Sequence, residues 1–324
     1  MNPIKFFSLF IILSVLGILY DKHLKKNRDQ DNINKYNLIQ EYLFNDKTIF
    51  DNRPILWIHV HHDINSRHWL NFMSKNTNFL NQSYKELCIE SIIKHCSNSF
   101  NICIIDDESF GKILPKWSIQ MNKLADPIKS HIRTLGLFKV LYKHGGMLVP
   151  SHFICLKDMI HTHNKNTRYG KCYVSETVNH NRTHTVNGVV PSSLMMGCDK
   201  ENETMGEMIQ YLENVNSTIH NDFYEFESVL NHLYTKINKY KMNVISAQDI
   251  GIKNKDNKLI IIDDLMSNAP MNLLETKLGI LVDDNQLQKR RHFGWFLNQS
   301  KKQVLESNIN MSKYIILALN SNDF

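Results

Sequence analysis

The sequence predicts an α/β protein with a mainly parallel sheet, preceded by an N-terminal membrane-anchor helix. Apolar runs at residues 54–62 and 100–109 flank an amphipathic stretch at residues 81–98. This β-α-β order implies two parallel strands joined by a right-handed crossover. The third observation is the apolar run at residues 4–20. A chain of 324 residues, 42% of them hydrophobic, can build one substantial core.

The first element is the predicted anchor. Residues 4–20 read IKFFSLFIILSVLGILY, which is near the lower length limit of a membrane span. No small-x-small cleavage site follows, and the next residues are DKHLKKNR, so we favour an uncleaved anchor over a signal peptide. The flanking positive charge places the body of the protein on the cytosolic side. We predict an anchor over residues 1–21, a polar linker over 22–50 and one α/β domain over 51–320.

The strand at residues 54–62 and the helix at 81–98 are followed by a strand at 100–109 that ends in acids. A longer helix is predicted over residues 125–146, with Asp126 as its cap, Pro127 in its first turn and an apolar face at Ile128, Ile132, Leu135 and Phe138. Gly145 or Gly146 supplies the left-handed residue that ends it. Short apolar strands follow on either side of residues 150–152.

The second half of the chain has a weaker pattern. Residues 169–177, 192–198 and 258–266 are predicted as strands, the last ending in paired acids. Residues 203–215 and 223–237 are predicted as helices.

Composition excludes some functions. The formal net charge is +6, but basic and acidic residues are interleaved, so we predict no nucleic-acid partner. The six cysteines form no C-x-x-C pair. We therefore interpret them as small buried apolar residues in a reducing compartment.

The helix and strand around residues 130–152 carry a resemblance to a known family. Ser130, Arg133, Tyr142, Gly145 and Gly146 fit the pattern S-D-x-x-R, about ten residues, then Y-G-G and a short strand. This arrangement resembles the glycosyltransferases with a DXD sugar-binding motif, a group that includes capsular polysaccharide synthesis proteins. The resemblance implies a GT-A fold, which is a Rossmann-like nucleotide-sugar-binding domain. It also implies a luminal location, so the side of the membrane stays open.

The acids of this family pattern are missing. His131 stands where the pattern has an aspartate, and Pro150 and His152 stand where the DXD acids are expected. In the family those carboxylates hold a divalent ion on the donor's diphosphate. Proline cannot bind a metal ion, and imidazole is a poor ligand for Mg²⁺ or Mn²⁺. We therefore predict no metal cofactor of the usual kind.

The candidate donor-binding residues come from strand ends, the motif and the strongest later basic cluster. They are His59, His61, Asp107, Ser130, Arg133, Gly145, Gly146, His152, Arg290 and Arg291. Other interpretations stay open: Arg133 pairs with a nearby carboxylate, and Arg290 and Arg291 form a solvated helix end. His59, His61, His131 and His152 form a transition-metal site or are ordinary hydrogen-bonded histidines. The acid pairs at 106–107 and 263–264 supply a catalytic base, or they are turn formers or helix caps.

Two functions within the family resemblance remain open. The chain transfers sugar from a nucleotide-sugar donor to a glycan or protein acceptor without a DXD-bound metal, through catalytic residues that the sequence does not identify. Alternatively, it is an inactive relative that binds a nucleotide, glycan or partner protein. A third interpretation is an unrelated α/β protein in which the two glycines only end a helix.

Overall fold

The structure is a computed structural model that describes residues 41–44, 51–60, 82–177, 190–218, 232–233, 235–237 and 239–321. Residues 1–45 and 46–324 form two separate units, and the elements below belong to the second. The predicted anchor and most of the predicted linker lie outside the described residues, as does most of the predicted helix at 223–237. Within the described ranges, no helix combines the length and apolar character needed to cross a membrane.

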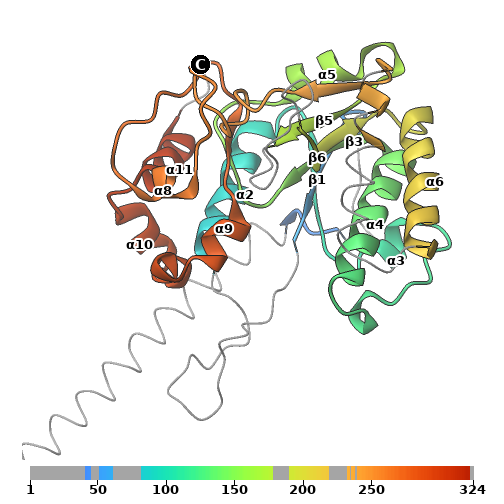
Figure 1. The fold of residues 1–324 in the computed structure, drawn as a ribbon, viewed down its shortest axis with the longest axis horizontal. Helices are drawn as coiled ribbons and strands as arrows, with labels where there is room; N and C mark the ends of the chain where they lie inside the picture. The colour runs from blue at the N-terminus through green and yellow to red at the C-terminus, as the bar shows by residue number, and fades with distance from the viewer. Residues whose placement is uncertain are drawn as a thin grey trace, which may run out of the picture. The chain divides into compact units, whose positions relative to one another are not determined.

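A six-stranded sheet forms the centre of the second unit, in the order β2-β1-β3-β6-β5-β7 (Figure 1). The strands are β1 (Ile55–His59), β2 (Asn101–Ile105), β3 (Gly146–Pro150), β5 (Cys172–Thr177), β6 (Val190–Cys198) and β7 (Met242–Ile245). β1 is parallel to both β2 and β3, and β5 is parallel to β7. Only β6 runs antiparallel to its neighbours in this sheet. The predicted α/β class with a mainly parallel sheet is therefore confirmed.

A separate two-stranded sheet joins distant parts of the chain. β4 (Phe153–Cys155) pairs antiparallel with β8 (Gly279–Leu281). Because β4 begins directly after His152 and β8 ends three residues before Asp284, the pairing brings these two residues into one region.

The described helices are α2 (Ser83–Cys96), α3 (Phe110–Ile113), α4 (Ile128–His144), α5 (Ile160–Thr167), α6 (Glu203–Thr218), α8 (Ile262–Met266), α9 (Asp284–Lys289), α10 (Lys301–Glu306) and α11 (Asn310–Asn320). Most helices pack as two groups, seen on either side of the sheet in the view of Figure 1, whereas α5 lies at the top of that view and contacts β5 and β6. α4 packs against α6, and α2 packs against α10 and α11. The second group buries a core that includes Leu87, Leu265 and Ile315.

The predicted ends of α4 are partly wrong. The helix begins at Ile128, and Pro127 is the residue before it, with no side-chain cap from Asp126. Leu135 and Phe138 are buried as predicted, but Ile128 is 57% exposed, because the first turn extends beyond the packed part of the helix.

The Gly-Gly break after α4 has a backbone cause. Gly145 and Gly146 have φ angles of +72° and +97°, which side chains other than hydrogen rarely allow. A Cβ at Gly146 would lie 2.1 Å from the carbonyl oxygen of Ile55, the first residue of β1. Gly146 therefore lets β3 start in close contact with β1, and Gly145 lets the chain pass the backbone of Lys200, 2.8 Å from the position of a Cβ.

The predicted strand at residues 258–266 is wrong. Residues 262–266 form the helix α8. Its apolar residues Ile262, Leu265 and Met266 recur at helical spacing and are buried in the core near α11. Asp263 and Asp264 lie in its first turn, where carboxylates favour the helix N-terminus. Tertiary burial of one helical face therefore outweighs the β-branched run before it.

All six cysteines are free and buried, which confirms their predicted burial. The closest approach is 4.0 Å between the sulfur atoms of Cys96 and Cys155.

Candidate functional site

The carboxyl ends of three parallel strands meet at one edge of the sheet. His59 at the end of β1 lies level with Ile105 of β2 on one side and with Pro150 of β3 on the other. Sites in parallel α/β sheets form outside this edge, because the following loops bring side chains together there. We call it the carboxyl edge.

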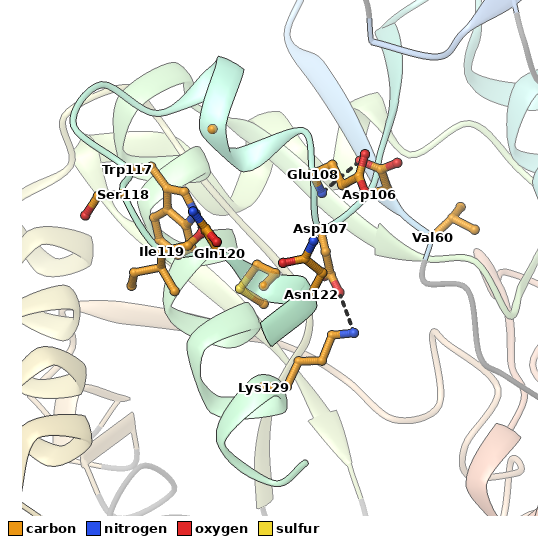
Figure 2. Close-up of a pocket in the computed structure, with 12 residues that line it drawn as sticks. Val60, Asp106, Asp107, Glu108, Trp117, Ser118, Ile119, Gln120, Asn122 and Lys129 are labelled. Atoms are coloured by element: carbon orange, nitrogen blue, oxygen red, sulfur yellow. Dashed lines mark hydrogen bonds and ion pairs between the residues drawn. The ribbon is translucent and has the colours of Figure 1, made fainter. Parts of the chain in front are cut away.

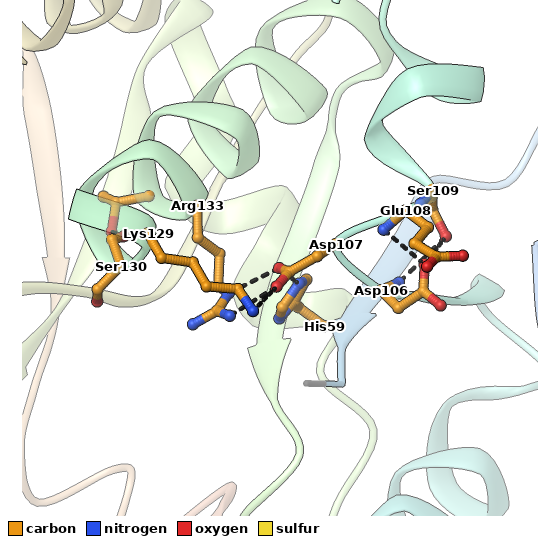
Figure 3. Close-up of polar contacts among 9 residues, drawn as sticks. His59, Asp106, Asp107, Glu108, Ser109, Lys129, Ser130 and Arg133 are labelled. Atoms are coloured by element: carbon orange, nitrogen blue, oxygen red, sulfur yellow. Dashed lines mark hydrogen bonds and ion pairs between the residues drawn. The ribbon is translucent and has the colours of Figure 1, made fainter. Parts of the chain in front are cut away.

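The two acids that follow β2 have different roles. Asp106 folds back on the chain: its Oδ1 accepts from the backbone N–H of Ser109 at 2.8 Å and from the Ser109 hydroxyl at 2.6 Å. Asp106 is therefore a turn former. Asp107 points to the other side, toward α4 (Figure 3).

Asp107 is the centre of a charged cluster at the carboxyl edge. Arg133 of α4 donates to it through two atoms, with Nε 2.7 Å from Oδ1 and Nη2 2.6 Å from Oδ2. His59 Nε2 lies 3.1 Å from Oδ1, and Lys129 Nζ lies 3.6 Å from Oδ2. Figure 3 shows all three side chains directed at this carboxylate. Lys129 and Arg133 reach it together because they are four residues apart on one helix face.

The cluster keeps Asp107 ionised. Burial alone would raise the pKa of Asp107, but the hydrogen bonds from Arg133 and His59 and the charges of both lower it well below its usual range. The Arg133 and Asp107 side chains are only 17% and 15% exposed, so solvent screens their attraction weakly. The aromatic ring of Phe110 stacks on the His59 imidazole, with the two ring centroids 5.7 Å apart, and holds the orientation of the imidazole.

A cavity of about 460 Å³ opens beside this cluster. One wall is the segment from Trp117 to Asn122, and the other is Asp106–Glu108 with Lys129 (Figure 2). This volume lies in the range of about 300–1,000 Å³ that is common for small-molecule sites.

A second polar network surrounds Asp284, the first residue of α9. The Asp284 carboxylate accepts hydrogen bonds from the Tyr84 hydroxyl, from Lys85 Nζ at 2.7 Å and from Gln288 Nε2 at 2.9 Å. Burial alone would raise the pKa of Asp284. The charges of Lys85 and His152 lower this pKa by more, so the net shift is downward. His152, which stands at a DXD position in the family pattern, thus acts electrostatically on a carboxylate from a distant segment.

The structure brings some predicted site residues together and separates others. His59, Asp107 and Arg133 meet at the carboxyl edge, whereas Ser130 is exposed on α4 and takes no part in the contacts drawn in Figure 3. Gly145 and Gly146 lie at the opposite, amino end of β3, where Gly146 packs against Ile55 and Gly145 against the backbone of Asp199 and Lys200. Close backbone packing there accounts for their geometry.

Arg290 and Arg291, two further candidate donor-binding residues, take no part in the Asp107 cluster. Arg290 pairs with Asp263 of α8, and His292 Nε2 lies 3.9 Å from the same carboxylate, while Arg291 is exposed. Donor binding by these arginines stays a prediction. His61 lies outside the described residues.

A metal site was an open interpretation for the histidines. Among the residues that the structure describes, no three histidine, cysteine, aspartate or glutamate side chains are grouped so that they could hold a metal ion. At the described part of the carboxyl edge, Arg133 and Lys129 balance the charge of Asp107.

Sequence reasoning missed Lys129, Lys85 and Asp284. The four-residue spacing between Lys129 and Arg133 was a detectable signal, since it places both cations on one face. The run LGILVDD at residues 278–284 also resembles a strand that ends in acids. Lys85 had no such signal, because its role depends on contact with a residue 199 positions later.

Comparisons with known proteins give a limited result. No protein-family model matches the chain, and no curated protein is similar to it. Two structures of the glycosyltransferase GlyE from Streptococcus pneumoniae TIGR4 align with 61% of this chain and 46% of theirs. The apo form gives a TM-score of 0.36 at 12% identity, and the other gives 0.33 at 11%. The chain thus matches less than half the length of these neighbours.

Proposed function

We propose that the chain is a glycosyltransferase-like protein that binds a nucleotide-sugar donor at the carboxyl edge without a DXD-bound metal. The observation that carries this proposal is the convergence of His59, Lys129 and Arg133 on Asp107 beside a cavity. Positioned cations substitute for a divalent ion by offsetting the charge of a diphosphate and its leaving group.

Lys129 is the cation of this cluster that is best placed to reach a ligand, while Arg133 holds Asp107 through Nε and Nη2. Lys129 lies 3.6 Å from Asp107 and is 28% exposed, so its ammonium can turn to a phosphate without leaving the carboxylate uncompensated. Lys129 is therefore the residue of the cluster that we expect to contact the diphosphate. The acceptor is a glycan or a protein.

A second function is favoured by one specific contact. Because Arg133 is already neutralised by a two-atom contact with Asp107, its charge acts on a ligand only partly. A protein that binds a nucleotide or glycan without transferring sugar needs no more than this. The inactive relative is therefore the alternative candidate.

The test is calorimetric titration of the purified chain with UDP and with GDP, each in excess EDTA and in Mn²⁺. We expect binding in EDTA, and we expect Lys129→Gln to weaken it about tenfold, which corresponds to the loss of one charge-assisted hydrogen bond. Lys112→Gln, at an exposed position of α3, is the matched control and should leave affinity unchanged.

Two results would overturn the proposal: no binding of either nucleotide, or binding that appears only with Mn²⁺. Release of UDP or GDP from a panel of nucleotide sugars then separates the two candidates. A transferase releases the nucleotide in multiple turnovers, whereas the inactive relative binds the donor and leaves it intact.

A further inference from the structure

The cavity beside Asp107 has a lining that differs from the cationic cluster next to it. Asp106, Asp107 and Glu108 contribute three carboxylates to its wall, and Lys129 contributes one ammonium. Arg133 touches Asp107 but does not line the cavity. Even with Asp107 paired to Arg133, a diphosphate inside the cavity would face more negative than positive side chains, which disfavours it there.

The opposite wall is uncharged and rich in hydrogen-bonding groups. Ser118, Gln120 and Asn122 are exposed and line the cavity, and the two amides each offer both donors and acceptors. In the view of Figure 2, Gln120 and Asn122 lie between Trp117 and Asp107. Amides opposite carboxylates are well suited to hydroxyl groups, which donate to one and accept from the other.

Trp117 adds a fixed flat apolar surface to this wall. Its indole Nε1 donates to the carbonyl oxygen of Ile119 at 3.0 Å, and its ring packs against Phe110 with centroids 5.3 Å apart. These contacts set the orientation of the indole before any ligand binds, so a ring that packs on it loses little affinity to side-chain ordering.

From these three features we infer that the cavity binds an uncharged, hydroxyl-bearing ring through Gln120, Asn122 and Trp117. The charged part of the same ligand, or of its neighbour, lies at the side of the cavity where Lys129 and Arg133 converge on Asp107. The ring is either the nucleoside sugar of a donor or a sugar residue of a glycan, since both present the same hydroxyl chemistry. This inference adds a ring-binding site to the proposed function. It depends on that function for the identity of the charged group beside the ring.

The test uses three probes on the full chain: uridine, maltotriose and inorganic pyrophosphate, each measured by calorimetry and by saturation-transfer NMR. The variant is Gln120→Ala combined with Asn122→Ala, whose exposed positions should leave the fold intact. Asn164→Ala, an exposed asparagine of α5 outside the cavity, is the matched control.

We expect uridine or maltotriose to bind the wild-type chain and to bind the double variant about tenfold or more weakly, the loss of one or two hydrogen bonds. Pyrophosphate binding should be unchanged in that variant. Uridine binding identifies a nucleoside, and maltotriose binding identifies a glycan. The inference is overturned if neither neutral probe binds, or if the double variant binds them as the wild type does.

Failure of the proposed function gives a different result. If pyrophosphate fails to bind while a neutral probe binds and depends on Gln120 and Asn122, the metal-free diphosphate site is refuted and the ring site stands. If pyrophosphate binds and the neutral probes do not, the reverse holds. If no probe binds, both are refuted.

Discussion

The pair between Asp107 and Arg133 gives the sharpest prediction about this chain. Asp107→Asn keeps the shape of the side chain and one acceptor oxygen but removes the negative charge. The Arg133 side chain, which is only 17% exposed, then keeps a hydrogen-bond acceptor but loses its ion-pair partner. Removing one partner of a buried, hydrogen-bonded ion pair typically destabilises a protein by about 3–5 kcal/mol. Because Asn retains part of the hydrogen bonding, we expect the free energy of unfolding to fall by about 3 kcal/mol at pH 7.

The pH dependence follows from the lowered pKa of Asp107. Since the folded state holds this pKa below its unfolded value of about 3.9, the stabilisation is fully present above that pH. It is lost as the pH falls further, toward the folded pKa. The difference between wild type and Asp107→Asn should therefore be smaller at pH 3 than at pH 5.

The assay is urea unfolding of both proteins at pH 7, 5 and 3. Asp51→Asn is the matched control, because Asp51 makes the same kind of contact with Arg53 but with 54% and 40% exposure, where solvent screening leaves little net effect. A difference below about 1 kcal/mol at pH 7, or one that persists undiminished at pH 3, would refute the reasoning.

Three further predictions concern packing, the second network and the thiols. Gly146→Ala should destabilise the fold by about 3 kcal/mol or more in urea unfolding, because of its φ of +97° and the contact with Ile55. The control Gly111→Ala, with no atom within 4 Å of the new Cβ, should change stability by less than about 1 kcal/mol. Equal effects would contradict this explanation of the Gly-Gly break. Lys85→Met should lower the free energy of unfolding by about 3 kcal/mol, because the Asp284 carboxylate, which is 11% exposed, loses its ion-pair partner. Adding Asp284→Leu should restore part of this loss. A double variant that is less stable than Lys85→Met alone would contradict the pairing. Burial raises the pKa of the Cys103 and Cys172 thiols to about 12, and all six cysteines are buried. Ellman's reagent should therefore label no cysteine quickly in the native chain and all six in urea. Rapid labelling of any thiol before unfolding would contradict its burial.

The sequence predicts best where one local pattern determines the outcome. β1, α2 and β2 form as predicted because each buries a face with the right periodicity, and the parallel pairing follows from their order. Gly145 or Gly146 was predicted to supply a left-handed residue at the end of the helix, and both have a positive φ. The donor role that the family resemblance gave them stays a prediction, and the conformation of Gly146 also serves the packing of β3 on β1.

The sequence predicts poorly where long-range burial decides. Residues 258–266 have strand-like composition, yet α8 forms because its apolar face packs near α11. At the site, Arg133 was expected to pair with a carboxylate as one open interpretation, but that this carboxylate is Asp107 depends on how α4 lies against the turn after β2, which no local pattern encodes. The network of Asp284 with Lys85 and His152 was not predicted for the same reason.

The pairing of β4 with β8 also has a consequence for biosynthesis. The two strands are more than 100 residues apart in sequence, so β4 leaves the ribosome long before its partner exists. Until residue 284 is made, His152 and the start of α2 have no Asp284 to act on. The region around His152 is thus completed late, and nascent chains that stop before β8 will expose the apolar face of β4 to chaperones and proteases.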